Sequence, residues 1–68
     1  MSKPSWDDAP EWANYRARDQ YSGWWWYELN PIWDNENEEW DTQYDSKAIR
    51  ASAGFERIGA KNSLGARP

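Results

Sequence analysis

Apolar and polar positions alternate with a period of two in the first and third of three segments of the chain, and the second segment opens with four consecutive aromatic residues. The first segment covers residues 14–19, the second covers 24–29, and the third covers 40–44. Because successive side chains of a strand point to opposite faces, this alternation predicts strands rather than helices. We therefore expect a small β-rich (α+β) fold, built as a three-stranded antiparallel meander within residues 1–45.

The second segment holds four consecutive aromatic residues, which a strand must divide between its two faces. Trp25 and Tyr27 share one face, and the two other tryptophans share the opposite face. With a four-residue turn before this strand, Arg16 and Arg18 would lie against Trp25 and Tyr27, where cation–π contact is geometrically allowed. A turn one residue different exchanges the partners. The sequence leaves this register open, and Gly23 supplies the turn geometry.

A short helical lid is predicted before the first strand. Asp8 and Glu11 are three residues apart and fit a capping box, which places a helical turn over about residues 9–14. Trp6 and Trp12 flank this turn. We expect these two tryptophans to cover one face of the sheet and to shield part of its small core.

The character of the chain changes after residue 45. Ser46 is placed to cap a short helix over residues 47–53, so residues 46–58 are predicted to form a short helix or docking segment. Residues 59–68 show no core-forming pattern. We expect them to form a flexible, disordered basic tail.

Composition narrows the chemistry that this chain can perform. A chain of 68 residues forms one domain with a small core. It has no Cys and no His, which removes disulfides, thiolate metal sites and the commonest general base. The acidic cluster around residues 34–41 lacks the glycine-centred spacing of a calcium loop. We predict a protein that is not an enzyme and that has no cofactor or metal site.

The charges are distributed unevenly along the chain. Residues 1–46 hold three basic and eleven acidic residues, for a net charge of −8. Residues 47–68 hold five basic residues and one acidic residue, for a net charge of +4. An acidic body is repelled by a phosphate backbone and attracts a basic protein. We expect no membrane span, because no apolar run approaches about 20 residues. No signal-peptide pattern follows Met1, so we expect a cytoplasmic protein.

The candidate contact residues combine aromatic, basic and acidic side chains. Trp and Tyr are enriched in protein interfaces, and acidic loops steer a protein towards a basic partner. Trp33, which follows Pro31 beside the acidic loop, is the aromatic residue that we expect to be an exposed contact. The predicted partner-binding residues are Arg16, Arg18, Trp25, Tyr27, Trp33, Glu36, Glu38 and Glu39.

Part of the chain resembles a group of phage proteins. Roughly residues 5–40 resemble small uncharacterised proteins of tailed bacteriophages. Those proteins share a W-x-D-A-P-x-W-A motif, an acidic Gly turn, an aromatic W-x-W-[FY]-E strand and a Pro. The matching positions here are Trp6, Asp8, Ala9, Pro10, Trp12, Ala13, Asp19, Gly23, Tyr27, Glu28 and Pro31. The turn Gln20-Tyr21-Ser22-Gly23 departs from that pattern. The resemblance implies a phage accessory protein acting in a bacterial host.

A weaker resemblance is to WW domains. Trp12 and Trp33 are 21 residues apart, as two Trp residues are in that family, but here Pro31 precedes the second Trp instead of following it.

Together, these observations predict a protein that binds and modulates or inhibits a host protein. One form of this is an acidic mimic of DNA directed at a nuclease, a polymerase or a defence complex. The alternative is single-stranded nucleic-acid binding through exposed aromatic residues. Self-association through an open sheet edge is a third interpretation.

Overall fold

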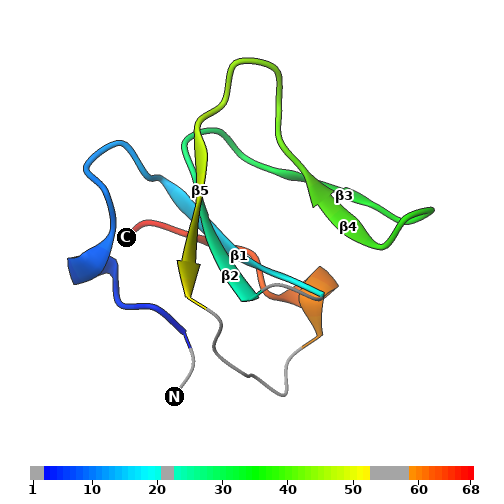
Figure 1. The fold of residues 1–68 in the computed structure, drawn as a ribbon, viewed down its shortest axis with the longest axis horizontal. Coiled ribbons are helices and arrows are strands. Elements are labelled where there is room, and N and C mark those ends of the chain that lie inside the picture. The colour runs from blue at the N-terminus through cyan, green and yellow to red at the C-terminus, as the bar shows by residue number, and fades with distance from the viewer. Residues whose placement is uncertain (1–2, 21–22, 53–58) are drawn as a thin grey trace.

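The computed structural model describes residues 3–20, 23–52 and 59–68, which form two antiparallel sheets (Figure 1). The larger sheet has four strands in the order β5-β2-β1-β6, and the smaller pairs β3 with β4. The strands are β1 (Tyr15–Asp19), β2 (Gly23–Tyr27), β3 (Ile32–Asp34), β4 (Glu39–Asp41), β5 (Ala48–Ser52) and β6 (Gly65–Ala66), with 3-10 helices η1 (Trp6–Asp8) and η2 (Ala60–Asn62). The predicted β-rich antiparallel class is confirmed. No helix in the described part of the chain is long and apolar enough to cross a membrane.

The β1–β2 register places the arginines on the face opposite to Trp25. Ala17 pairs with Trp25 and Arg18 pairs with Trp24, because the strands are joined by three residues and not four. Gly23 takes a φ of 91° at the start of β2. Arg16 and Arg18 therefore share a face with Trp24 and Trp26. The arrangement in which they lie against Trp25 and Tyr27 is wrong.

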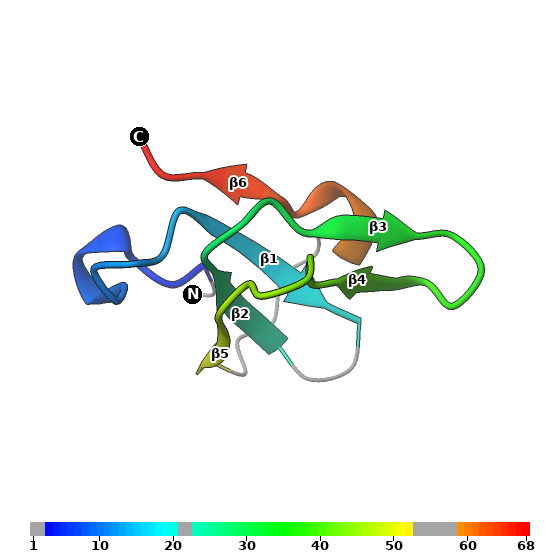
Figure 2. The same ribbon diagram turned by 90° about the horizontal axis from the view of Figure 1, so that it is seen from above.

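The three-stranded meander is also corrected by the structure. The third predicted strand does not join β2. It is shortened to β4 and pairs with β3, forming a separate hairpin that extends beside the larger sheet (Figure 2). Pro31 is buried where the chain leaves β2. Only four residues connect β3 and β4, so this local pairing requires little loop-closure entropy.

The second neighbour of β2 is β5, in a segment for which the sequence predicted a helix. Residues 48–52 are extended, and the Ser46 Oγ accepts a hydrogen bond from the Leu29 N–H at 3.1 Å instead of capping a helix. The Glu28 N–H donates to the Lys47 carbonyl at 2.9 Å, which aligns β5 with β2. The helix over 47–53 is therefore wrong for these residues. Residues 53–58 of the predicted segment lie outside the described residues.

The C-terminal residues are part of the fold and not a disordered tail. β6 pairs with the outer edge of β1, where Tyr15 lies opposite Ala66. At the C-terminal cap of η2, the buried Ser63 Oγ accepts from the Arg18 N–H at 2.7 Å and donates to the Ala60 carbonyl at 2.6 Å. The prediction of disorder was wrong for residues 59–68 because the edge of β1 supplies pairing partners that the tail's own sequence does not reveal.

The N-terminal lid is shorter than predicted and begins earlier. It is the 3-10 turn η1, which Ser5 caps by accepting a hydrogen bond from the Asp7 N–H at 3.1 Å. The helix over 9–14 does not form. Ala9 is extended, with φ −77° and ψ 145°, as the residue before Pro10 tends to be.

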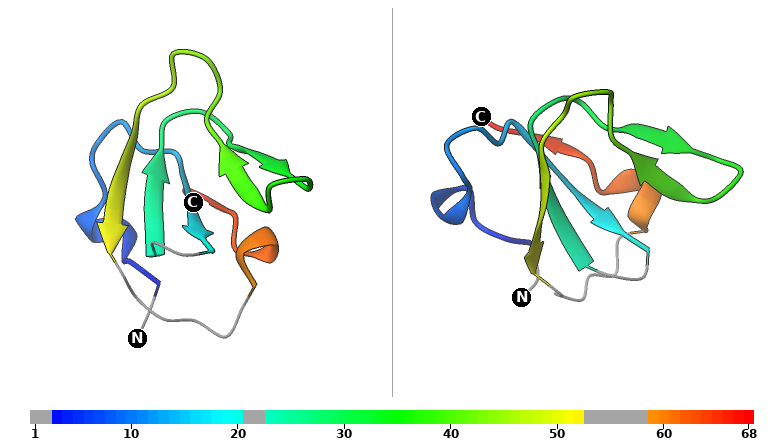
Figure 3. Two further views of the ribbon diagram at one scale, coloured as in Figure 1. Left: turned by 45° about the vertical axis from the view of Figure 1, so that its right-hand side comes forward. Right: turned by 45° about the horizontal axis from the view of Figure 1, so that its top comes forward.

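The lid lies against the Trp24–Trp26 face of the sheet. The Trp6 and Trp26 rings are 5.2 Å apart between centroids. Trp24 is 0% exposed and Trp26 is 4% exposed, so both belong to the core, whereas Trp40 is half-buried. The lid lies at one end of the molecule, and the β3–β4 hairpin lies at the other end (Figure 3).

Candidate functional site

The β3–β4 hairpin, residues 32–41, has two chemically different faces, and we call it the acidic hairpin. Trp33 lies opposite Trp40, and the two rings meet edge to face with centroids 5.2 Å apart. The Trp40 Nε1 donates to the Ala60 carbonyl at 3.0 Å, which ties this aromatic face to the body of the protein. Because side chains alternate, the remaining hairpin residues form the outward face. These are Ile32, Asp34, Glu39 and Asp41.

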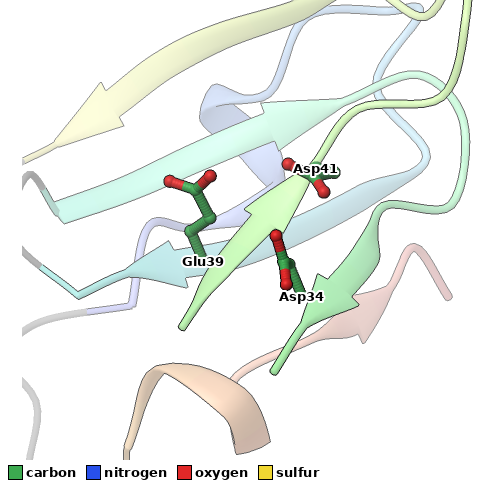
Figure 4. Close-up of side chains that lie close together, drawn as sticks. All are labelled: Asp34, Glu39 and Asp41. Carbon is green, nitrogen blue, oxygen red and sulfur yellow. The ribbon is translucent and has the colours of Figure 1, made fainter. Parts of the chain in front are cut away.

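Three carboxylates of the outward face converge (Figure 4). One carboxylate oxygen each from Asp34, Glu39 and Asp41 lies within 4.8 Å of the others. Asp34 and Glu39 are direct cross-strand partners, a position where like charges destabilise a hairpin. The repulsion remains in the fold, so this face concentrates negative charge at a cost in stability.

Hydrogen bonds within the turn keep Asp34 ionised. Its carboxylate accepts from the Asn37 Nδ2 at 2.9 Å and from the backbone N–H groups of Glu36 and Asn37 at 2.9 and 3.3 Å. These donors, with the Asn37 side chain contributing most, lower the pKa of Asp34 below its ordinary value. The turn that connects the strands thus also maintains the charge of the outward face.

Among the described residues, Asp34, Glu39 and Asp41 are the group close enough to share a cation. Calcium takes six to eight oxygen ligands, and exposed carboxylates commonly gather without a metal. Their arrangement alone does not define a metal centre. The absence of a metal site stays a prediction from the sequence.

A hollow of about 500 Å³, which we call the hairpin hollow, separates the acidic hairpin from η2 and the end of β1. The hairpin contributes Trp33, whose Nε1 donates to the Asn35 Oδ1 at 2.9 Å, and Glu38, which has a φ of 54°. The opposite wall carries basic and amide groups. The lining residues on that wall are Arg18, Gln20, Gly59, Ala60 and Lys61.

A second hollow of about 160 Å³ lies where the hairpin meets the four-stranded sheet, and we call it the aromatic hollow. Its floor comes from β1, β2 and β5, and its wall comes from β4 and the residue after it. The lining residues are Asp19, Trp25, Tyr27, Trp40, Thr42 and Ala48. Burial, together with the charges of Asp19 and Asp41, raises the pKa of Tyr27 to about 12.

The structure divides the predicted contact residues among several places. Arg18, Trp33 and Glu38 come together around the hairpin hollow. Trp33 is half-buried there and not fully exposed. Glu36 and Glu39 are exposed on the acidic hairpin.

The remaining predicted residues lie elsewhere. Trp25 and Tyr27 line the aromatic hollow, where Tyr27 is only 4% exposed. Arg16 lies on the opposite face of the sheet, with its Cζ 5.0 Å from the centre of the Trp6 ring, and contributes to neither hollow.

Sequence reasoning missed several residues of these surfaces. Ile32, Asp34 and Asp41 complete the outward face, and Asp19 and Trp40 complete the aromatic hollow. The four polar residues at 35–38 were the available hint of a turn, but strands of three residues on either side are too short to show a period. No local signal relates β1 to β4, which are brought together only by the fold.

Searches against protein-family models, curated proteins and solved structures find no match to this chain. The resemblance to phage proteins therefore stays a prediction.

Proposed function

We propose that this protein is a non-enzymatic binding module that attaches to a basic surface of a partner protein through the outward face of the acidic hairpin. The observation that carries the proposal is an exposed apolar side chain beside converging charges. Ile32 is 59% exposed and shares its face with the carboxylates of Asp34, Glu39 and Asp41. In protein interfaces, apolar anchors supply binding energy while surrounding charges orient the partner.

The charge of the hairpin supports a basic partner. Residues 34–41 contain five acidic residues and no basic residue. Such a segment accelerates encounter with a positively charged surface, and the effect weakens as salt is added. A phosphate backbone would be repelled from the same face. This charge distribution favours a protein partner over a nucleic acid.

The repulsion between Asp34 and Glu39 is a second supporting observation. Natural folds tend to break local stability rules at functional sites, where a bound partner compensates for the cost. Basic side chains of a partner would relieve this repulsion on binding. Free and bound forms should therefore differ in the stability of the hairpin.

In its more specific form, the proposal describes a phage accessory protein in the bacterial cytoplasm that modulates or inhibits a host protein. This form is supported by the resemblance in residues 5–40. Convergent carboxylates also suit a DNA mimic, in which they occupy the positions of phosphates in a nucleic-acid groove. Competition between this protein and duplex DNA for the captured partner would favour the mimic.

The proposal is tested by tagged capture from bacterial lysate, with and without nuclease, using three forms of the full chain. The hairpin variant carries Glu39→Lys and Asp41→Lys. The control variant carries Asp8→Lys and Glu11→Lys, which make the same charge change at exposed positions beside the lid at the other end of the molecule.

We expect the wild type and the control variant to retain the same protein after nuclease treatment. The hairpin variant should bind it at least about tenfold more weakly, or ~1.4 kcal/mol. Circular dichroism verifies that all three forms are folded. Equal retention by the hairpin variant would refute the proposal. Recovery that disappears with nuclease would favour single-stranded nucleic-acid binding instead.

A further inference from the structure

The aromatic hollow has the size of a small organic group. Its volume is about 160 Å³. A cavity of about 150 Å³ is large enough to hold a benzene molecule. The hollow therefore has room for a compact group of up to about six heavy atoms, such as a trimethylammonium group, but not for a large ligand.

Three aromatic side chains from two separate strands surround this space. Trp25 and Tyr27 lie two positions apart on β2 and so share one face of the sheet, while Trp40 comes from β4. Trp40 is held by its hydrogen bond to Ala60 and by its edge-to-face contact with Trp33. The aromatic walls are thus positioned by the fold before any ligand arrives.

The hollow is also electronegative. The face of an aromatic ring carries partial negative charge and attracts cations, Trp most strongly. Asp19 adds a carboxylate to the lining, and the charges of Asp19 and Asp41 help to keep the Tyr27 phenol neutral. The described lining residues include this acid and no base. An anion would be repelled here, and a neutral apolar group would gain nothing from the charge.

The same chain already places cations over aromatic rings elsewhere. Arg16 and Arg67 lie 5.0 and 5.5 Å from the centre of the Trp6 ring, and the Lys47 Nζ lies 5.8 Å from that of Trp12. Arg50 pairs with Trp25 across the β2–β5 ladder but is not among the lining residues of the hollow. Because Arg50 lies opposite Trp25 on the neighbouring strand, its charge would oppose a cation bound beside Trp25.

We propose that the aromatic hollow binds an organic ammonium group, with Trp25, Tyr27 and Trp40 surrounding its methyl groups and Asp19 balancing its charge. Methyl groups on the nitrogen suit apolar walls, and spreading the charge over them lowers the cost of leaving water. Two sources carry this chemistry: a free quaternary ammonium compound and a methylated lysine side chain. The site does not depend on the partner proposed for the acidic hairpin, because it uses Trp40 on the aromatic face of the hairpin and none of the residues of the outward face.

The test is a titration of the full ¹⁵N-labelled chain with choline, monitored by NMR at the Trp indole N–H groups. The matched control ligand is 3,3-dimethyl-1-butanol, in which carbon replaces the charged nitrogen of choline. We expect saturable shifts with choline and an affinity at least about tenfold higher than for the neutral compound. This comparison uses the wild-type protein and so does not depend on the folding of a variant.

Two test variants, one control variant and a second ligand pair identify the binding residues and the source of the ammonium group. Asp19→Asn should weaken choline binding without changing the response to the neutral compound, and Glu36→Gln, an equal charge change on the exposed hairpin turn, should change neither. Arg50→Gln should strengthen choline binding. Nε-trimethyl-lysine amide, compared with lysine amide, tests the side-chain source: tighter binding than choline supports a methylated lysine, and weaker binding supports a free compound. No saturable shift with either ammonium, or equal binding of the neutral compound, would overturn the proposal.

Discussion

Replacing Arg67 with alanine tests whether the C-terminal strand holds the N-terminal segment in place. The Arg67 N–H donates to the Asn14 carbonyl at 2.8 Å. Its Nη1 donates to the carbonyls of Ala13 and Pro10 at 2.6 and 3.0 Å, and its Cζ lies 5.5 Å from the centre of the Trp6 ring. Alanine keeps the backbone bond and removes the other three contacts.

The expected loss of stability follows from these contacts. Hydrogen bonds from a charged donor contribute about 1.5–3 kcal/mol, and the two here share one nitrogen, so we count them once. A cation–π contact adds about 0.5–1 kcal/mol. The Arg67→Ala variant should therefore lose about 2–4 kcal/mol. Since a domain of this size has about 3–10 kcal/mol in total, its Tm should fall by roughly 10–20 °C.

The assay is urea unfolding monitored by tryptophan fluorescence, which reports the free energy of unfolding. The control is Lys61→Ala, which removes the same charge from an exposed position in the same segment and should change stability by less than about 0.5 kcal/mol. If Arg67→Ala is as stable as this control, the contacts of Arg67 do not form in solution. Residues 59–68 would then behave as the disordered tail that the sequence predicts.

Other substitutions test the core, the hairpin and the titrating groups. Trp26→Ala should cost about 3–5 kcal/mol and unfold the domain in circular dichroism, because it removes a buried indole that supports the lid; a folded variant would contradict this placement. Glu39→Gln should raise the Tm at low salt and not at high salt, since it relieves repulsion with Asp34, and a lower Tm would count against that repulsion. Tyr27, whose folded pKa is raised to about 12 from 10.0, contributes stability that is complete below pH 10 and lost between pH 10 and about 12; the Tyr27→Phe variant should lack this step in alkaline unfolding, and an unchanged profile would argue against it. Asn37→Ala should raise the pKa of Asp34 towards 3.8 in an NMR titration. Ionised Asp34 stabilises the fold, and this contribution, which is lost as the pH falls below 3.8, should be smaller in the variant; an unchanged pKa would exclude the Asn37 hydrogen bond.

Local sequence patterns were sufficient to predict β1 and β2. The predicted strands over 14–19 and 24–29 correspond closely to Tyr15–Asp19 and Gly23–Tyr27. Trp24 and Trp26 share one face, as residues two positions apart on a strand must, and that face is buried. Trp6 was expected to cover one face of the sheet, and the structure shows that it contacts Trp26 on this face.

The candidate site was predicted only in part. Exposed acids at Glu36, Glu38 and Glu39 were visible in the sequence as a charged loop. Their relation to Trp33 was not, because a difference of one residue in the hairpin turn exchanges the inward and outward faces. For the same reason, the pairing of Trp25 with Ala17 could not be read from the sequence.

The sequence by itself determined a small, acidic, aromatic β protein with two central strands and a buried tryptophan face. Only the tertiary structure decided that residues 48–52 and 65–66 complete the sheet and that β4 joins β3. Strands of two or three residues are too short to show a period, and β6 pairs with a strand about 50 residues earlier in the chain. Such segments become strands because an edge of the sheet offers them hydrogen-bond partners, and that edge exists only once the rest of the chain has folded.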